Sequence, residues 1–135
     1  MNRRKGKSDG AVMLYDKNGQ IKWETLIGGS AADSFNAVTE ANDGSYVAVG
    51  VSQSNDGNLA NLNKGGKDGI IAKLDSNGTL IKVVTVGGSD ADELKAIQPA
   101  GDGGFIVAGY SHSTDLDMNG LNKIETDRDA IIVKI

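Results

Sequence analysis

The chain consists of two copies of one unit, and this internal repeat constrains its fold more than any other feature. The copies are 59 residues apart, as between Asp9 and Asp68. The polar and glycine positions Asp9-Gly10, Asp16, Asn18-Gly19, Gly28-Gly29-Ser30, Asp33, Asp43-Gly44 and Gly50 return as Asp68-Gly69, Asp75, Asn77-Gly78, Gly87-Gly88-Ser89, Asp92, Asp102-Gly103 and Gly109. A fixed period of this length is typical of stacked structural units.

A third copy begins at Asp129, because residues 129–135 repeat the pattern of residues 68–74 at a spacing of 61. We therefore predict one repeat domain over residues 1–135, with units at about 9–67 and 68–128 and a partial third unit at 129–135. We expect the chain to be a slice of a longer array or a protomer that closes with copies of itself. Since unpaired sheet edges invite association, we expect it to self-associate or to be only marginally stable.

The composition favours short β-strands and excludes several partners. Of 135 residues 19 are Gly, and 39% are hydrophobic with only 4% aromatic, which suits strands and tight turns around an aliphatic core. A net charge of −4 argues against nucleic acid as a partner. The absence of cysteine excludes disulfides and thiol chemistry. No apolar stretch approaches the roughly 20 residues that span a bilayer, and residues 1–10 lack the apolar centre of a signal peptide.

Each unit is predicted to contain four segments. Strands are expected at residues 11–15, 21–27 and 46–52 in the first unit and at 70–74, 80–86 and 105–111 in the second. Asn18-Gly19 and Asn77-Gly78 favour two-residue hairpin turns with positive φ angles. The third segments, 34–41 and 93–100, remain ambiguous between strand and helix. Phe35, Val38 and Ala41 have helical spacing, whereas Pro99 and the shortness of the segment argue against a helix.

The order of motifs in the second unit carries a resemblance. Lys73 to Gly78, then Gly87-Gly88-Ser89 with Asp92, then residues 102–111 resemble the roughly sixty-residue β-propeller-like repeats of bacterial secreted and cell-surface proteins. The resemblance covers nearly the whole chain. It implies an all-β fold of antiparallel four-stranded propeller blades, about two blades plus extra strands. The alternative is an α+β fold with a ββαβ repeat.

By this resemblance each unit follows one order of strands across the blade. The strands 34–41, 46–52, 69–74 and 80–86 run from the central channel to the outer edge. Two departures make the strand edges less certain, since Trp23 has Lys82 as its counterpart and Glu40 has Pro99.

Two long connections, residues 53–67 and 112–128, are expected on the same face as the Gly-Gly-Ser corners, and binding sites are commonly on such loops. The strongest local signal there is Asp115, Asp117 and Asn119, followed by Gly120. These fit the opening of a calcium loop, in which alternating oxygen ligands surround the cation. The sequence therefore predicts a calcium site at these three residues and no other cofactor.

The calcium motif is incomplete. Its twelfth position, where a Glu is expected, is Thr126, with Glu125 and Asp127 on either side. The first copy has Asp56 and Asn58 but lacks the third ligand. The alternative interpretation is a polar loop whose Asp and Asn side chains cap their own turns.

Other candidate residues favour structural roles. Asp33 and Asp92 recur in each unit, which favours hydrogen bonding to the turn over catalysis. His112 has no nucleophile motif beside it and is interpreted as a loop residue. Trp23 and Tyr110 are expected to pack between units.

We therefore expect a non-enzymatic propeller module of a secreted or cell-surface bacterial protein. It would serve as a scaffold or binding surface for protein or glycan, on the face of the long loops, without a membrane span. An export signal would then lie outside this chain. The alternatives are a fragment of a propeller enzyme acting on polysaccharide, and a purely structural spacer.

Overall fold

The computed structural model describes residues 5–121 and 127–135, and the chain is all-β, as predicted. Its strands are β1 (Gly10–Tyr15), β2 (Ile21–Ile27), β3 (Asp33–Glu40), β4 (Tyr46–Ser52), β5 (Asp68–Leu74), β6 (Leu80–Val86), β7 (Asp92–Pro99), β8 (Phe105–Ser111) and β9 (Asp129–Lys134). Two single-turn 3₁₀ helices, η1 (Gly57–Leu59) and η2 (Leu116–Met118), lie in the long connections. Within these described ranges no helix is long and apolar enough to cross a membrane.

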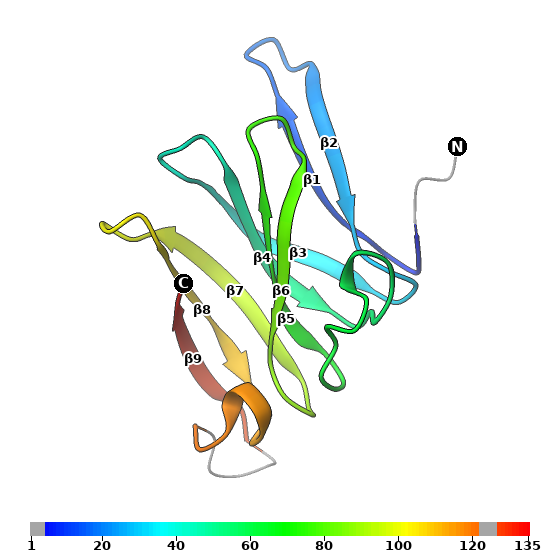
Figure 1. Ribbon diagram of the computed structural model, residues 1–135, viewed down its shortest axis with the longest axis vertical. Helices are drawn as coiled ribbons and strands as arrows, with labels where there is room; N and C mark the ends of the chain where they lie inside the picture. The colour runs from blue at the N-terminus through cyan, green and yellow to red at the C-terminus, as the bar shows by residue number, and fades with distance from the viewer. Residues whose placement is uncertain (1–4, 122–126) are drawn as a thin grey trace.

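The strands form three antiparallel sheets that follow one another along the chain (Figure 1). The N-terminal sheet pairs β1 with β2, the central sheet has the order β3-β4-β5-β6, and the C-terminal sheet has the order β7-β8-β9. Each strand pairs with its neighbour in sequence, so the central sheet is a four-stranded meander.

The ββαβ alternative is wrong, because both ambiguous segments are strands. β3 pairs with β4, and β7 pairs with β8. The helix-like spacing has a different cause: β7 carries an irregularity between Leu94 and Ala96, where one extra residue shifts the side-chain alternation. Leu94 and Ile97 consequently face the same side of the strand although they are three residues apart, and both are buried in one cluster.

The hairpin turns differ from the two-residue turns that we expected. Gly19 has a φ of 79°, but Asn18 is not in the left-handed region. The loop instead closes around Asp16, whose Oδ1 accepts hydrogen bonds from the backbone N–H of Asn18 at 2.8 Å and of Gln20 at 2.9 Å. These hydrogen bonds stabilise the turn without a second residue at positive φ. Asp75 accepts the equivalent hydrogen bonds from the backbone N–H of Asn77 and Thr79 in the second unit.

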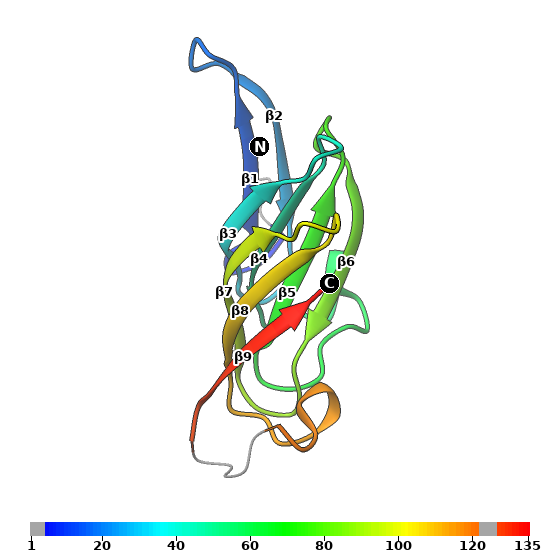
Figure 2. The same cartoon turned by 90° about the vertical axis from the view of Figure 1, so that its left-hand side faces the viewer.

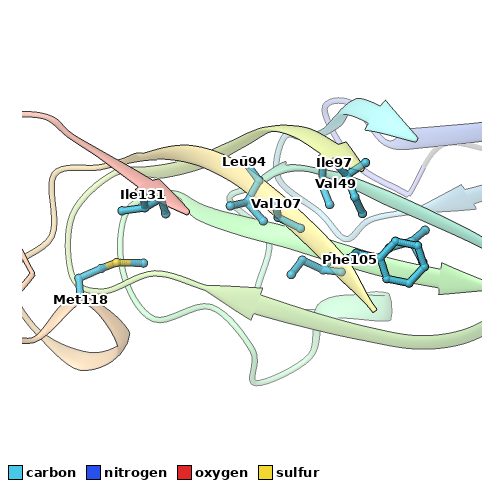
Figure 3. Close-up of a cluster of buried hydrophobic side chains, with 9 residues drawn as sticks. Val49, Leu94, Ile97, Phe105, Val107, Met118 and Ile131 are labelled. Atoms are coloured by element: carbon cyan, nitrogen blue, oxygen red, sulfur yellow. The ribbon is translucent and has the colours of Figure 1, made fainter. Parts of the chain in front are cut away.

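Figure 2 shows the successive sheets side by side. The buried hydrophobic side chains form two clusters, one on each face of the central sheet. Ile70 and Ile71 are consecutive residues of β5 and point to opposite faces, yet they are only 1% and 6% exposed. Ile70 packs in the cluster toward the N-terminal sheet, and Ile71 packs in the cluster toward the C-terminal sheet. Figure 3 shows the second cluster, which includes Leu94, Phe105 and Met118. The central sheet is therefore covered on both faces.

Trp23 packs between two sheets, as predicted. Its indole Nε1 donates a hydrogen bond to the Ser76 carbonyl at 3.1 Å, and its ring lies edge-on to Tyr46 at 5.5 Å. A Cβ on Gly78 would lie 2.5 Å from the indole ring, so this turn needs glycine both for its φ of 82° and for contact with Trp23.

Candidate functional site

The Gly-Gly-Ser corner that precedes β7 is held by one buried carboxylate. Asp92, only 1% exposed, accepts through Oδ2 from the backbone N–H of Gly88 at 2.7 Å and from the Ser113 hydroxyl at 2.8 Å. Its Oδ1 accepts from the Ser111 hydroxyl. A buried acceptor with three donors fixes the corner to β8 and to the start of the long connection.

The first unit has the same arrangement at the start of β3. Asp33 accepts from the backbone N–H of Gly29 at 2.9 Å and from the hydroxyls of Ser52 at 2.5 Å and Ser54 at 2.7 Å. The repetition of every hydrogen bond fits the structural role predicted for both aspartates.

The residues of the expected calcium loop contact the same corner. Asp115 Oδ1 accepts from the backbone N–H of Ser89 at 2.8 Å. Asp117 Oδ2 accepts from the backbone N–H of Gly87 at 3.1 Å and from the Lys64 ammonium. Asn119 is exposed and follows η2. The structure therefore brings Asp115 and Asp117 to two different amides, and both side chains already have donors.

The first unit makes equivalent contacts with a weaker set of charges. Asp56 accepts from the backbone N–H of Ser30 at 2.6 Å, and Asn58 Oδ1 accepts from the backbone N–H of Gly28 at 3.3 Å and from the Lys5 ammonium. Asn58 has a neutral amide oxygen where Asp117 has a carboxylate. The hydrogen bond to the corner is therefore made equally by either oxygen, and it requires an acceptor but no charged metal ligand.

The part of the chain described by the structure contains no group of three or more His, Cys, Asp or Glu side chains placed to hold a metal ion. Glu125 and Thr126 lie outside the described residues, and Asp127 is exposed. Calcium binding by Asp115, Asp117 and Asn119 stays a prediction.

A second buried carboxylate lies beside Asp92. Asp68 is 0% exposed, and its Oδ2 accepts from the backbone N–H of Lys64 at 2.7 Å. Its Oδ1 is buried without a hydrogen-bond partner among the described residues. A Cβ on Gly87 would overlap both Asp68 Oδ1 and Asp92 Oδ2, so the two oxygens flank the same glycine. Burial raises the pKa of Asp68, and the charge of Asp92 raises it further.

This raised pKa predicts that Asp68→Asn stabilises the protein at neutral pH. The folded state binds the proton of Asp68 more tightly than the unfolded chain does, so its contribution is full below the unfolded pKa, near 3.8, and is lost as the pH rises through the higher folded pKa. Asn carries no charge to desolvate, so the Asn variant does not lose stability as the pH rises through the range where Asp68 titrates.

The measurement is the free energy of unfolding by urea from pH 3 to pH 8. Wild type should lose stability relative to the Asn variant as the pH rises above the ordinary range of Asp. The control is Asp90→Asn, which changes an exposed carboxylate of the same corner. An Asp68→Asn protein less stable than wild type at pH 7 would contradict the assignment.

A cluster of charged and aromatic side chains lies at the long-loop end of the C-terminal sheet. The Tyr110 hydroxyl donates to Glu93 Oε2 at 2.5 Å, and Lys95 forms an ion pair with Glu93. The Arg128 guanidinium lies 4.7 Å from the Tyr110 ring centroid, and the Lys95 ammonium lies 5.6 Å from it. The His112 ring is 5.9 Å away. One aromatic ring thus has two cations within cation–π distance.

Glu93 is the acceptor at the centre of this cluster. Burial acts to raise the pKa of Glu93, but hydrogen bonds from Lys95, Tyr110 and Asn36 outweigh it and hold that pKa below its ordinary value. The hydrogen bond to Glu93 raises the pKa of Tyr110, and the same carboxylate raises the pKa of Lys95. At neutral pH the cluster therefore contains a Glu93 carboxylate that is paired with a cationic Lys95 and hydrogen-bonded to a neutral phenol, with the Arg128 guanidinium over the ring.

The cluster is not repeated in the first unit. The counterparts of Glu93, Lys95, Tyr110, His112 and Arg128 are Ser34, Asn36, Val51, Gln53 and Lys67. Sequence reasoning assigned Tyr110 to packing between units and His112 to a loop, and it missed the cluster. The signal was present in the sequence as a set of differences between two otherwise similar copies.

Comparison with known proteins gives no family for this chain: no protein-family model matches it, and no curated protein matches it at a significant level.

Proposed function

We propose that the chain is a non-enzymatic β-propeller-type repeat module that presents a binding surface for protein or glycan in a secreted or surface-exposed bacterial protein. The four-stranded meander and the face-to-face packing of successive sheets support the blade assignment, with β3 innermost and β6 outermost. The bacterial setting rests on the resemblance of the repeat.

The observation that carries the binding proposal is the unrepeated cluster around Tyr110. A scaffold residue is expected to recur in each unit, as Asp33 and Asp92 do, whereas a ligand site needs a departure from the repeat. Lys95 and Arg128 are exposed, and Tyr110 is half-buried between them. Lys95 is paired with Glu93, so Arg128 is the cation of this cluster that the ligand argument uses. A guanidinium beside an aromatic ring favours a ligand that carries a carboxylate, because guanidinium pairs with carboxylate and the ring offers an apolar surface.

We expect an oligosaccharide of uronic acids to bind the chain in isothermal titration calorimetry, and a glutamate-rich peptide serves as the parallel probe for a protein ligand. Tyr110→Ala and Arg128→Ala should each weaken binding at least tenfold, since central aromatic and Arg contacts commonly contribute about 2 kcal/mol or more. The probe that binds identifies the class of ligand.

The matched control is Lys67→Ala, because Lys67 is the counterpart of Arg128 in a unit that lacks the aromatic residue. Its affinity should equal that of wild type. If neither probe binds, or if Lys67→Ala weakens binding as much as Arg128→Ala does, the proposal fails, and the spacer alternative gains support.

A further inference from the structure

The C-terminal sheet has an open apolar face where the central sheet has a covered one. Ile106 and Ile132 are 47% and 77% exposed. Their counterparts in the central sheet, Val47 and Ile71, are 2% and 6% exposed because the C-terminal sheet packs on them. Ile106 and Ile132 therefore occupy the positions that form the interface between two sheets in the central unit, but no further sheet covers them in the described structure.

An open face of the complementary kind lies between β1 and β3, toward the N-terminal end of the stack of sheets. Val38 is 56% exposed, whereas its counterpart Ile97 is 8% exposed beneath the central sheet. Tyr15 is 51% exposed, whereas its counterpart Leu74 is fully buried. This end presents the side that normally receives a preceding sheet.

The strand edges are incomplete in a matching way. β5 pairs with β4 and β6, but its counterpart β1 pairs only with β2 in the described structure. β9, the counterpart of β5 in the third unit, pairs with β8 alone among the described strands. Compared with the four-stranded central sheet, the N-terminal sheet of the described structure lacks the first two strands, and the C-terminal sheet lacks the fourth.

Two grooves mark the position of that missing fourth strand. The first has a volume of 340 Å³ and is lined by Ile71, Val84, Phe105 and Ile135 among others. The second has a volume of 460 Å³ and runs between Val86 of β6 and residues 129–133 of β9. Ile27, the counterpart of Val86, is fully buried against a complete sheet, so both grooves lie where a fourth strand would cover β6.

We propose that these two ends bind each other between copies of this chain: the β1–β2 hairpin of one copy replaces β9 in the C-terminal sheet of a second copy, in a head-to-tail contact. The composite sheet then has the order β7-β8 from one copy and β1-β2 from the other, which matches β3-β4-β5-β6. β9 gives way because it supplies only the third strand, whereas the hairpin supplies the third and the fourth and fills both grooves. Arg128 directly precedes β9 and moves with it, so the Tyr110 site is complete only in a C-terminal sheet that has kept β9.

The repeat fixes the register of this exchange. Val47 pairs with Lys73 in the central sheet, so Ile106 of one copy is opposite Leu14 of the other. Ile106 and Ala108 then cover Val38 as Val47 and Val49 cover Ile97. The contact joins unlike surfaces, so it closes into a ring or propagates. After the exchange each copy supplies eight paired strands, β1 to β8, which make two four-stranded sheets. Propellers of about four to eight blades then correspond to two to four copies, and this ring size alone depends on the blade assignment proposed above.

The test is the mass of the full chain in solution, measured by analytical ultracentrifugation from 1 to 100 μM. Wild type should form oligomers, and Val38→Lys and Ile106→Lys should each shift it to a lower mass. Both positions are half exposed, so the variants should keep the wild-type circular dichroism spectrum. The matched control is Ile81→Lys, which changes a residue that is 57% exposed on β6 and already has Lys22 as its counterpart.

Ile132→Lys separates strand exchange from simple stacking. In the exchange β9 has left the sheet, so this variant should associate as wild type does. If two faces merely stacked with β9 in place, a lysine at this 77% exposed position would break the contact. Loss of association in Ile132→Lys would therefore overturn the exchange.

Mixing the two disruptive variants tests the head-to-tail geometry. A Val38→Lys chain keeps an intact C-terminal end, and an Ile106→Lys chain keeps an intact N-terminal end, so the mixture should form a dimer of one chain of each kind and stop there. An isologous contact would give no such dimer. A wild-type chain that stays monomeric at 100 μM would overturn the proposal as a whole, and it would leave ligand binding at Tyr110 unaffected.

Discussion

Replacing Asp92 with Ala is expected to destabilise the protein by about 3–5 kcal/mol. The change removes a buried carboxylate and leaves the Gly88 N–H and the hydroxyls of Ser111 and Ser113 without their acceptor. All three bonds go to the same buried side chain, and a buried donor left unpaired costs about 1–3 kcal/mol. The corner, the end of β8 and the long connection should loosen together because one side chain joins all three.

Urea unfolding at a fixed protein concentration measures this effect, since association would otherwise contribute to the apparent stability. The control is Asp90→Ala, two residues away in the same corner but exposed, for which we expect a change within about 0.5 kcal/mol. Asp92→Asn should fall between the two, because the amide keeps one acceptor oxygen. Equal stability of the Asp92→Ala and Asp90→Ala proteins would contradict the structural role of Asp92.

Gly50→Ala is expected to destabilise the protein by about 3 kcal/mol. Gly50 is opposite Phe35, at the bulge of β3, and the two backbones approach closely there. A Cβ on Gly50 would overlap the Ser34 carbonyl oxygen and lie 2.7 Å from the Phe35 Cα. These are backbone atoms of a paired strand and cannot rotate away as a side chain would, so β3 and β4 would have to separate.

Gly101→Ala is the comparison for this variant. A Cβ on Gly101 meets no atom within 4 Å, so the added methyl group should leave stability unchanged within about 0.5 kcal/mol. Thermal unfolding of the two alanine variants distinguishes steric overlap from a general requirement for glycine. If the Gly50→Ala and Gly101→Ala proteins had the same melting temperature, β3 would be able to move away from the added methyl group without loss of stability, and this prediction would be wrong.

Self-association and calcium binding remain predictions, whereas the extended state of the third segments is confirmed. Leu94 and Ile97 illustrate why the sequence left that segment ambiguous. Their spacing of three suits one face of a helix, but a bulge gives a strand the same spacing. Only the hydrogen bonds to β8 distinguish the two, and these depend on residues outside the segment.

The carboxylates of the long connection show a second limit. Asp115 and Asp117 are two residues apart, which suggests a local cation site. Their acceptor oxygens instead serve the backbone N–H groups of Ser89 and Gly87, which are 26 and 30 residues earlier. The spacing of residues within one loop does not show which hydrogen-bond donors from distant parts of the chain lie beside that loop in the folded protein.

The sequence by itself determined the repeat and three of the four strands in each unit, because these depend on local requirements: glycine at tight turns, aspartate beside turn amides and apolar residues at strand spacing. The extended state of the third segments was decided by their pairing with β4 and β8. Tertiary structure alone decided which polar groups meet. It joined Glu93, Tyr110 and Arg128 from two strands and a loop, and it left Val38 of β3 and Ile106 of β8 exposed. The physical reason is that burial and hydrogen bonding are properties of pairs of surfaces, and the repeat specifies each surface without specifying what covers the last one.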